Sequence, residues 1–436
     1  MTSFTSKEKD VSNQAPVQPA NAAPKKRKLA DLPDDYPTYG EIVWEQFRKY
    51  KLSYYSLWGV VILFSIAIFA PVIALNVPFF INVPEGIGPE MAQGLHFPWF
   101  STLFDANFFD SGVDIFFNSL IFTLPLTLIA WLLLAPRQRK KMPKERYKTW
   151  RGTFWLVATA GMLLVALGIY AMDFRQPYVD WAALSENDQV SSLYPLLRYS
   201  YRDVDLMSVA TSPSWQHFLG TDEQGRDVFT RMLFGTRISL TIGVLAVAIY
   251  TAIGMVMGGL GGFFGGRTDM IVLRLVEVML CFPSFFLILT LRGFVENASV
   301  FHIMLIIGVT GWTRIARLVR GEFLRLRRQD FVQAAIALGY TRTRIIFRHV
   351  MPNALGPVLV AATFGVAGAI LLEASLSFLG LGPTTAPSWG QILTVGRQTK
   401  LWALILAPGF AIFLTVSLLN LVGEGVRDAL DPKMRR

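Results

Sequence analysis

The sequence predicts an all-α polytopic membrane protein with about eight membrane spans. Of its 436 residues, 53% are hydrophobic and only 17% are charged, which is too apolar a composition for the surface of a soluble protein. The apolar residues are gathered in long uncharged runs, each close to the ~20 residues with which a helix crosses ~30 Å of hydrocarbon. We expect spans near residues 54–76, 116–135, 153–172, 238–263, 271–291, 297–313, 354–372 and 401–423.

The formal net charge of +10 is compatible with a nucleic-acid partner, but the distribution of that charge argues against one. The Lys and Arg residues lie in short clusters between the apolar runs, which is the pattern that orients a protein in the bilayer. The single cysteine, Cys281, excludes an internal disulfide, and the four histidines lack metal-ligand spacing. We therefore expect no nucleic-acid partner, no metal and no cofactor in this chain, with the lipid bilayer as its surroundings.

The charged loops predict that both termini are cytoplasmic, because Lys and Arg are retained on that side of the membrane. Basic residues at 25–28 precede the first expected span, whereas residues 77–115 contain acidic residues and no Lys or Arg. Residues 137–151 then hold eight basic side chains and a single acidic one. Continuing the alternation places the Arg-rich stretch 314–348 and the C-terminal VRDALDPKMRR inside.

The first part of the chain is expected to be a cytoplasmic tail. Residues 1–35 are rich in Lys, Pro, Ala, Asn and Ser and hold too few large apolar residues to offset the entropy of ordering, which predicts disorder. We expect no cleavable signal peptide, because the first apolar run begins only after residue 50.

Two short motifs flank the fourth expected span. The stretch GTDEQGRD, residues 220–227, predicts a capped turn that opens a separate amphipathic helix at the outer interface, which we favour over a carboxylate pair for acid–base chemistry. The run GGFFGGRT, residues 261–268, is close to a phosphate loop, but such a loop follows a strand in a nucleotide-binding domain. This run ends a membrane span, so we interpret its small residues as permitting close helix packing, and any ATP must be hydrolysed by a separate protein.

Two acidic residues in the expected spans are candidates for lining a transport path. Glu277 follows Arg274 at a spacing of three, which favours a local ion pair near the cytoplasmic end. A place in the path is the alternative, since an ionised side chain in lipid costs roughly 2–3 kcal/mol or more unless it faces protein or water. Glu373 lies at the outer end of the seventh span, where it is a candidate for facing the mouth of the path or a binding protein.

The cytoplasmic segment 321–356 carries the most specific pattern. Leu324, Phe331, Ala335 and Leu338 are spaced seven, four and three residues apart, which predicts that they share one face of a helix. The polar face opposite makes this helix amphipathic. Two interpretations fit these residues equally well: a docking surface for another protein, or a helix that lies on anionic lipid.

The end of this helix is also marked in the sequence. Gly339 is a natural residue to end the helix, and Thr341 or Thr343 can cap a second short helix. Pro352 suits the first turn of the next span. The small side chain of Ala334, close to Gly339, would let another backbone approach.

The pattern QAAIALG followed by MP resembles the EAA loop of ABC-importer permeases. Glu-Ala-Ala, a later Gly and a Leu-Pro pair define that loop; here Gln333 replaces the Glu and Met351 replaces the Leu. The resemblance implies that this segment is the coupling helix that sits in a groove of a cytoplasmic ATPase subunit. The coupling residues that it implies are Gln333, Ala334, Ala335, Leu338, Gly339 and Pro352.

Three further motifs resemble the C-type permease of dipeptide and oligopeptide importers: HFLGTDEQGRDVFTRMLFGTRISL, EASLSFLGLG with PSWG, and GEGVRDALDP. With the EAA-like region they extend the resemblance over residues 200–436. The ending GEGVRDALDP and the long first outside loop resemble the Yej-type branch, which handles peptides and microcin-like antibiotics. The resemblance implies a type I ABC-importer permease core of five to six spans, preceded by an extra span pair. The expected parts are a basic cytoplasmic tail (1–50), the first span with outside loops and inserted pair (51–236), and the permease core (237–436) with its coupling segment (321–351).

The resemblance further implies a permease subunit of a bacterial inner-membrane peptide importer. Its implied partners are a second, B-type permease, two ATPase subunits that use ATP and Mg, and an extracytoplasmic peptide-binding protein. This chain would then not itself be an enzyme. Alternatives are an ABC permease for another small solute, such as a nickel chelate or glutathione, and a secondary transporter or channel subunit driven by an ion gradient.

Overall fold

The computed structural model describes residues 39–295, 299–383 and 386–431. The tail predicted to be disordered, with its basic cluster, lies outside the described residues, as does Pro432 of the C-terminal motif. The chain divides into two compact units, Met1–Ile42 and Val43–Arg436. Helix α1 (Tyr39–Lys49) begins in the first unit and ends in the second, which holds all the other described elements.

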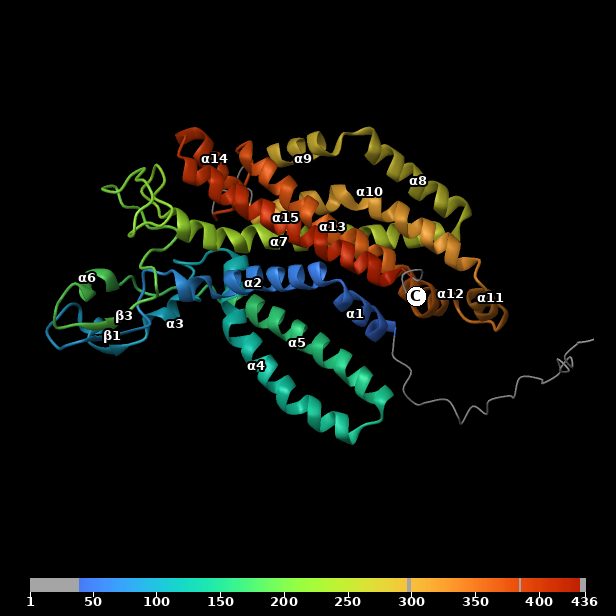
Figure 1. Cartoon of the computed structure of the whole chain (residues 1–436), viewed down its shortest axis with the longest axis horizontal. Coiled ribbons are helices and arrows are strands. Elements are labelled where there is room, and N and C mark those ends of the chain that lie inside the picture. Colours follow the sequence, from blue (N-terminus) through green and yellow to red (C-terminus); the bar gives the residue numbers. More distant parts are fainter. Residues whose placement is uncertain (1–38, 296–298, 384–385, 432–436) are drawn as a thin grey trace, which may run out of the picture. The chain divides into compact units, whose positions relative to one another are not determined.

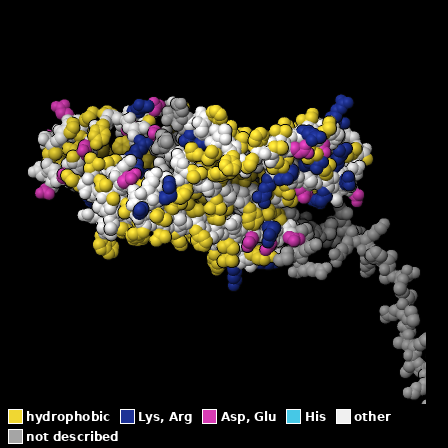
Figure 2. Space-filling model, turned by 90° about the horizontal axis from the view of Figure 1, so that it is seen from above, with side chains coloured by type: hydrophobic (Ala, Val, Ile, Leu, Met, Phe, Trp, Pro, Cys, Tyr) yellow, Lys and Arg dark blue, Asp and Glu magenta, His cyan; other side chains and the backbone are white. Residues whose placement is uncertain are grey.

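The second unit is a helical bundle whose membrane spans agree with the predicted number (Figure 1). Among the described residues, seven helices are long and apolar enough to cross a membrane, and a bent helix pair makes an eighth. Figure 2 shows hydrophobic side chains over much of one face, with charged side chains gathered toward its ends. The spanning helices are α2 (Lys51–Ile73), α4 (Gly112–Lys141), α5 (Lys144–Met172), α7 (Val228–Phe264), the pair α8 (Gly266–Cys281) and α9 (Ser284–Gly293), α10 (Val300–Arg327), α13 (Met351–Phe378) and α15 (Trp402–Leu430).

The bend in the fifth span has a local cause. Helices α8 and α9 are inclined at 79° to each other, and the residues between them are Phe282 and Pro283. Proline has no N–H to continue the helix, and it drives the residue before it out of the helical conformation. Phe282 accordingly has an extended ψ of 124°.

Glycines bring α7 and α10 into close contact at the centre of the bundle. Gly254, Gly258 and Gly262 lie four residues apart on one face of α7. A Cβ atom added at Gly258 or Gly262 would collide with the backbone of α10 at Ala316 and Arg320. This confirms that the small residues near the end of α7 serve close packing, and the glycine-rich run follows a helix instead of the strand that a phosphate loop requires.

The turn before α7 is confirmed, but the separate amphipathic helix predicted after it is wrong. The carboxylate of Asp227 caps the helix by accepting a hydrogen bond of 2.7 Å from the Thr230 N–H, and Asp222 accepts from the side chains of Arg226 (2.8 Å) and Arg231 (3.0 Å). From there α7 runs unbroken for 37 residues, or roughly 55 Å at 1.5 Å per residue. Because ~30 Å of hydrocarbon needs far fewer residues, the first turns of α7 extend beyond the span.

The two long loops predicted to lie outside fold together on one small sheet, which the all-α prediction missed. Strand β1 (Phe80–Val83) from the first loop is the centre of this antiparallel sheet. It pairs with β2 (Gly94–His96) and with β3 (Ser191–Leu193) from the second loop, so that Ile81 lies opposite His96 and Ser192. The short helices of these loops are η2 (Glu90–Ala92), α3 (Pro98–Thr102) and α6 (Trp181–Ser185).

A carboxylate joins the same two loops. Asp203 of the second loop accepts a hydrogen bond of 2.9 Å from the side chain of Asn76, which follows α2, and one of 2.7 Å from the Ser200 N–H. Burial raises the pKa of Asp203 to about 6, although the Ser200 N–H lowers it.

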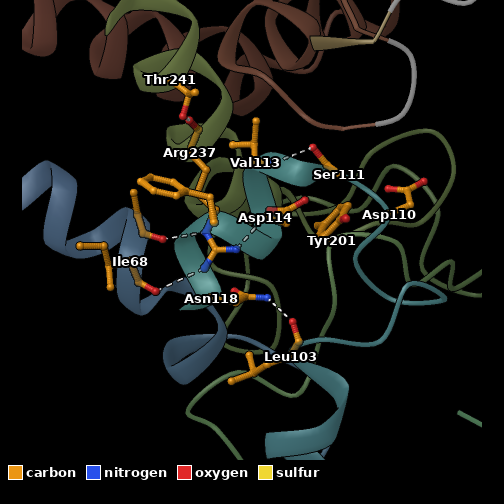
Figure 3. Close-up of polar contacts among 12 residues, drawn as sticks. Ile68, Leu103, Asp110, Ser111, Val113, Asp114, Asn118, Tyr201, Arg237 and Thr241 are labelled. Carbon is orange, nitrogen blue, oxygen red and sulfur yellow. Dashed lines mark hydrogen bonds and ion pairs between the residues drawn. The ribbon is translucent and has the colours of Figure 1, made fainter. Parts of the chain in front are cut away.

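A buried arginine fastens three helices at the same end of the bundle (Figure 3). Pro71 lies inside α2 and has no N–H, so the carbonyl of Ala67 lacks its helical donor. Arg237 of α7 supplies one: its Nε donates to the Ala67 carbonyl (2.7 Å) and its Nη2 to the Ile68 carbonyl (3.3 Å). Its Nη1 lies 3.1 Å from the carboxylate of Asp114 on α4, which balances the buried charge.

Candidate functional site

The site begins where α10 ends and the predicted coupling segment leaves the bundle. Helix α10 ends at Arg327, and α11 (Asp330–Ala337) begins only after Gln329. Gln329 has an extended ψ of 148°, which interrupts the helix between them. The prediction of one continuous helix whose face holds Leu324 to Leu338 is therefore wrong. Within α11, Ala335 is 4% exposed, while Leu338 at its end is 72% exposed.

Gly339 ends α11 as predicted. Its φ of +73° is the left-handed conformation that glycine adopts without strain. The N–H of Gly339 donates to the Ile336 carbonyl (2.9 Å), and the N–H of Tyr340 donates to the Ala335 carbonyl (3.2 Å). These two bonds close the end of the helix in a compact corner.

The chain then returns to the bundle through elements that were also predicted. The hydroxyl of Thr341 accepts a hydrogen bond from the Arg344 N–H (3.4 Å) and caps α12 (Arg342–Ile345). A π-helical turn, η3 (Ile346–Val350), leads directly into α13, which has Pro352 in its first turn.

Gln333 spans the break between α10 and α11. Its side-chain Nε2 donates to the carbonyl of Arg327 (2.8 Å), and the guanidinium of Arg327 donates to the carbonyl of Phe263 at the end of α7 (2.8 Å). A glutamate would have no hydrogen to donate to that carbonyl. The departure from the EAA pattern therefore has a structural use: the amide ties α11 to the end of α10.

The inner face of α11 is part of the bundle core, and its outer face is not. Val332 and Ala335 are buried in one cluster with Phe323 of α10 and with Val350 and Val358 of the chain that returns into α13. An ion pair between Asp269 of α8 and Arg320 of α10 joins α8 to α10 (2.7 Å). The exposed residues between 331 and 339 are Phe331, Gln333, Ala334, Ile336, Ala337, Leu338 and Gly339.

The two predicted path carboxylates lie apart from this segment and from each other. Glu277 lies on α8 and forms an ion pair of 2.8 Å with Arg274, and both side chains are exposed; this confirms the local pair. Glu373 is 1% exposed. It accepts hydrogen bonds from Ser377 (2.7 Å) and Ser239 (3.5 Å), so its carboxyl joins α13 to α7.

A groove that sequence reasoning did not identify runs between α10 and α13. Two cavities of about 220 and 590 Å³ share Arg314, Ala361 and Phe364 as lining residues. Arg314 and Arg317 are exposed there, and the side chain of neither forms a hydrogen bond or ion pair with another described residue. The sequence showed these arginines only as part of a sidedness signal, because their proximity to α13 depends on the fold.

The described residues contain no group of three His, Cys, Asp or Glu side chains that could hold a metal ion. The remaining described helix, α14 (Trp389–Thr399), begins beside the Glu373 cluster: the hydroxyl of Ser388 caps it and lies 3.4 Å from the Ser377 hydroxyl.

Comparison with known proteins gives two family matches. Residues 250–436 match the binding-protein-dependent transport system inner membrane component, and residues 38–85 match the N-terminal transmembrane domain of oligopeptide transport permease C.

Curated relatives agree with these matches. The chain is 41% identical to the oligopeptide transport system permease protein OppC of Bacillus subtilis, over 55% of this chain and 79% of that protein. It is 44% identical to OppC of Haemophilus influenzae, over 54% of this chain and 78% of that protein. It is 35% identical to the dipeptide transport system permease protein DppC of Alkalihalophilus pseudofirmus, over 70% of this chain and 97% of that protein.

Among solved structures, the chain is similar to an inward-facing form of the MetNI methionine ABC transporter. The identity is 19% and the TM-score is 0.39, over 45% of this chain and 95% of the matched chain.

Proposed function

Because this chain belongs to the family of binding-protein-dependent inner-membrane permeases, with OppC and DppC among its relatives, we propose that it forms half of the membrane path of an ATP-driven peptide importer. The observation that carries the proposal is α11. This helix has an apolar inner face built into the bundle and an outer face with exposed Leu338 and Ile336. Exposed apolar residues on a rigid support are typical of a protein interface.

The proposed partners are a second, B-type permease, two ATPase subunits and an extracytoplasmic peptide-binding protein. ATP and Mg would be bound by the ATPase subunits. Closure of these subunits would displace α11, and the cluster around Val332 and Ala335 would carry that displacement to α7, α10 and α13 as a unit. The spans would thereby shift between outward-open and inward-open states, each favoured by different ligand contacts.

We propose the groove between α10 and α13 as this subunit's side of the path. It offers unpaired guanidinium groups at Arg314 and Arg317 beside the apolar side chain of Phe364. Arginine recognises carboxylates with paired hydrogen bonds, and every peptide with a free C-terminus carries a carboxylate. The groove therefore suits a peptide better than a neutral solute.

The sidedness is also a proposal, and it rests on the basic loops. The bacterial inner membrane would have α11 and both chain termini on its cytoplasmic side and the small sheet outside. Within the family, the ending GEGVRDALDP supports the Yej-type branch, whereas the relatives compared above are named for oligopeptides and dipeptides.

Co-purification with the ATPase tests the proposal. Leu338→Asp places a charge on the exposed end of α11 without disturbing its buried face, and we expect the chain to insert normally but to lose the ATPase. Leu206→Asp is the matched control, because Leu206 is equally exposed (77% against 72%) in the loop after β3. Retention of the ATPase by Leu338→Asp would refute docking at this surface, and uptake that stops only with an uncoupler would indicate a secondary transporter.

A further inference from the structure

An apolar cavity separates the inserted helix pair from the permease core. It has a volume of about 420 Å³ and is walled by α2, α4, α5, α7 and α10. Its wall is almost entirely hydrocarbon. The hydroxyl of Thr241 already donates a hydrogen bond to the Arg237 carbonyl of its own helix (2.6 Å), so the polar group left in the wall is the hydroxyl of Tyr170, at one end. Typical wall residues are Phe64, Val113, Leu163, Leu167, Val244 and Phe301.

The helix pair is attached to the core at one end. Asp114 binds the buried Arg237 at the start of α4. After α5, the carbonyl of Phe174 accepts from the Ala106 N–H (2.8 Å), and the Gln176 N–H donates to Asp105 (3.3 Å). At the opposite end, the loop between α4 and α5 stands apart from the other spanning helices in Figure 1.

Charged groups of both signs lie at the fastened end. A second cavity of about 330 Å³ also has Tyr170 in its wall, together with Asp110, Asp173 and Arg175. Arg175 pairs with Asp173 at 3.1 Å, and both side chains are more than half exposed. Asp110 pairs with Arg202 at 2.5 Å and is 47% exposed. Tyr170 therefore stands between an apolar compartment and a polar one with both charges within reach of a ligand.

We propose that these two cavities together bind one zwitterionic glycerophospholipid, such as phosphatidylethanolamine. An acyl chain fills the apolar cavity, the phosphate lies near Arg175, and the amine lies near Asp110 or Asp173. An apolar space of this kind does not hold water stably, and the surrounding helices place it at the depth of lipid tails. A peptide is excluded, because its N–H and C=O groups would find no partners in a hydrocarbon wall.

The bound lipid gives the inserted pair a second attachment to the core. Helices α4 and α5 pack chiefly on each other, with Trp131 stacked on Trp150 (5.8 Å, 12°). An acyl chain between α5 and α7 replaces the missing side-chain contacts, since apolar surfaces gain dispersion energy only when atoms fill the gap between them. This role is independent of which solute the permease carries.

Native mass spectrometry of the full-length chain, purified with its partner subunits from phosphatidylethanolamine-containing membranes, tests the proposal. Ala166 is 6% exposed and lines the apolar cavity, so Ala166→Trp fills it. Ala160, exposed on the same helix, provides the control Ala160→Trp. We expect Ala166→Trp to retain one phosphatidylethanolamine fewer than the wild type and Ala160→Trp to retain the wild-type number. Equal retention by all three proteins would overturn the proposal.

A second measurement needs no substitution in the cavity. Phosphatidylethanolamine with a photoreactive group in its acyl chain should label residues 163–170 of α5 and 240–245 of α7 in the wild-type complex. Arg175→Gln should lower this labelling at least threefold, while labelling by phosphatidylglycerol, which lacks the amine, should start lower. Labelling no stronger at these segments than at the exposed face of α5 would refute the lipid site, and labelling unchanged by Arg175→Gln would refute the proposed recognition of the headgroup.

Discussion

The contact between Asp114 and Arg237 gives the sharpest test of how the inserted helix pair is held. Both side chains are almost fully buried, with 3% and 0% of their surfaces exposed. Removing one partner of a buried ion pair leaves an uncompensated charge and typically costs 3–5 kcal/mol. We therefore expect Asp114→Ala to lower the free energy of unfolding by about 4 kcal/mol, and Arg237→Met to cost a similar amount.

The chain contains a matched control for this prediction. Asp110 and Arg202 form a pair of the same residue types at the same end, but their side chains are 47% and 35% exposed. Exposed pairs contribute about 0–1 kcal/mol, so Asp110→Ala should have little effect. The assay is equilibrium unfolding in mixed detergent micelles, followed by tryptophan fluorescence.

Two further variants separate charge from backbone bonding. The double variant Asp114→Ala, Arg237→Met should be less destabilised than the sum of its parts by at least ~2 kcal/mol, because it leaves no unpaired charge. The double variant should still lose about 1–3 kcal/mol of stability, because the buried carbonyl of Ala67 then has no hydrogen-bond donor. Adding Pro71→Ala to the double variant should recover part of this stability, since the N–H of alanine can donate to the Ala67 carbonyl within the helix. Equal losses for Asp114→Ala and Asp110→Ala, or strict additivity, would refute the reasoning.

Two further predictions concern the path and the outer loops. Arg314→Gln should lower uptake of peptides with a free C-terminal carboxylate at least tenfold, while uptake by Arg274→Gln on α8 should stay near the wild-type level; equal uptake by both variants would contradict a path between α10 and α13. For Asp203, burial raises the pKa from its ordinary value of 3.8 to about 6 in the folded chain, so the folded state binds the proton more tightly than the unfolded state. Stability should therefore fall as pH rises from about 4 to about 6 and then level off, and thermal unfolding of Asp203→Asn should lack this slope.

The sequence predicted what depends on local pattern. Uncharged runs located the spans, and the Gly339 corner and the Pro352 start of α13 followed from backbone preferences that act over a few residues. The role of this segment in coupling, which rests on the EAA-like pattern, stays a prediction. The break at Gln329 was missed because no proline or glycine marks it; it is stabilised by the Gln333 bond to the end of α10.

Features that join distant parts of the chain could not be predicted. The partners of Arg237 lie 123 and 170 residues away in the sequence, and no local pattern around Arg237 indicates them. The sheet was missed because its strands have only three or four residues and come from two different loops. The burial of Glu373 depends in the same way on Ser239 of another helix.

The central claim is that α11 couples this chain to an ATPase, and Gly339 tests it most directly. A Cβ atom at Gly339 would meet nothing within 4 Å in this chain, but the φ of +73° strains any residue other than glycine, with asparagine among the best tolerated. Peptide uptake and peptide-stimulated ATP hydrolysis should be measured together in vesicles that contain the complete importer. We predict that Gly339→Asn keeps both activities and that Gly339→Trp, though inserted in the membrane, loses both. Wild-type uptake and stimulation by Gly339→Trp would contradict the claim.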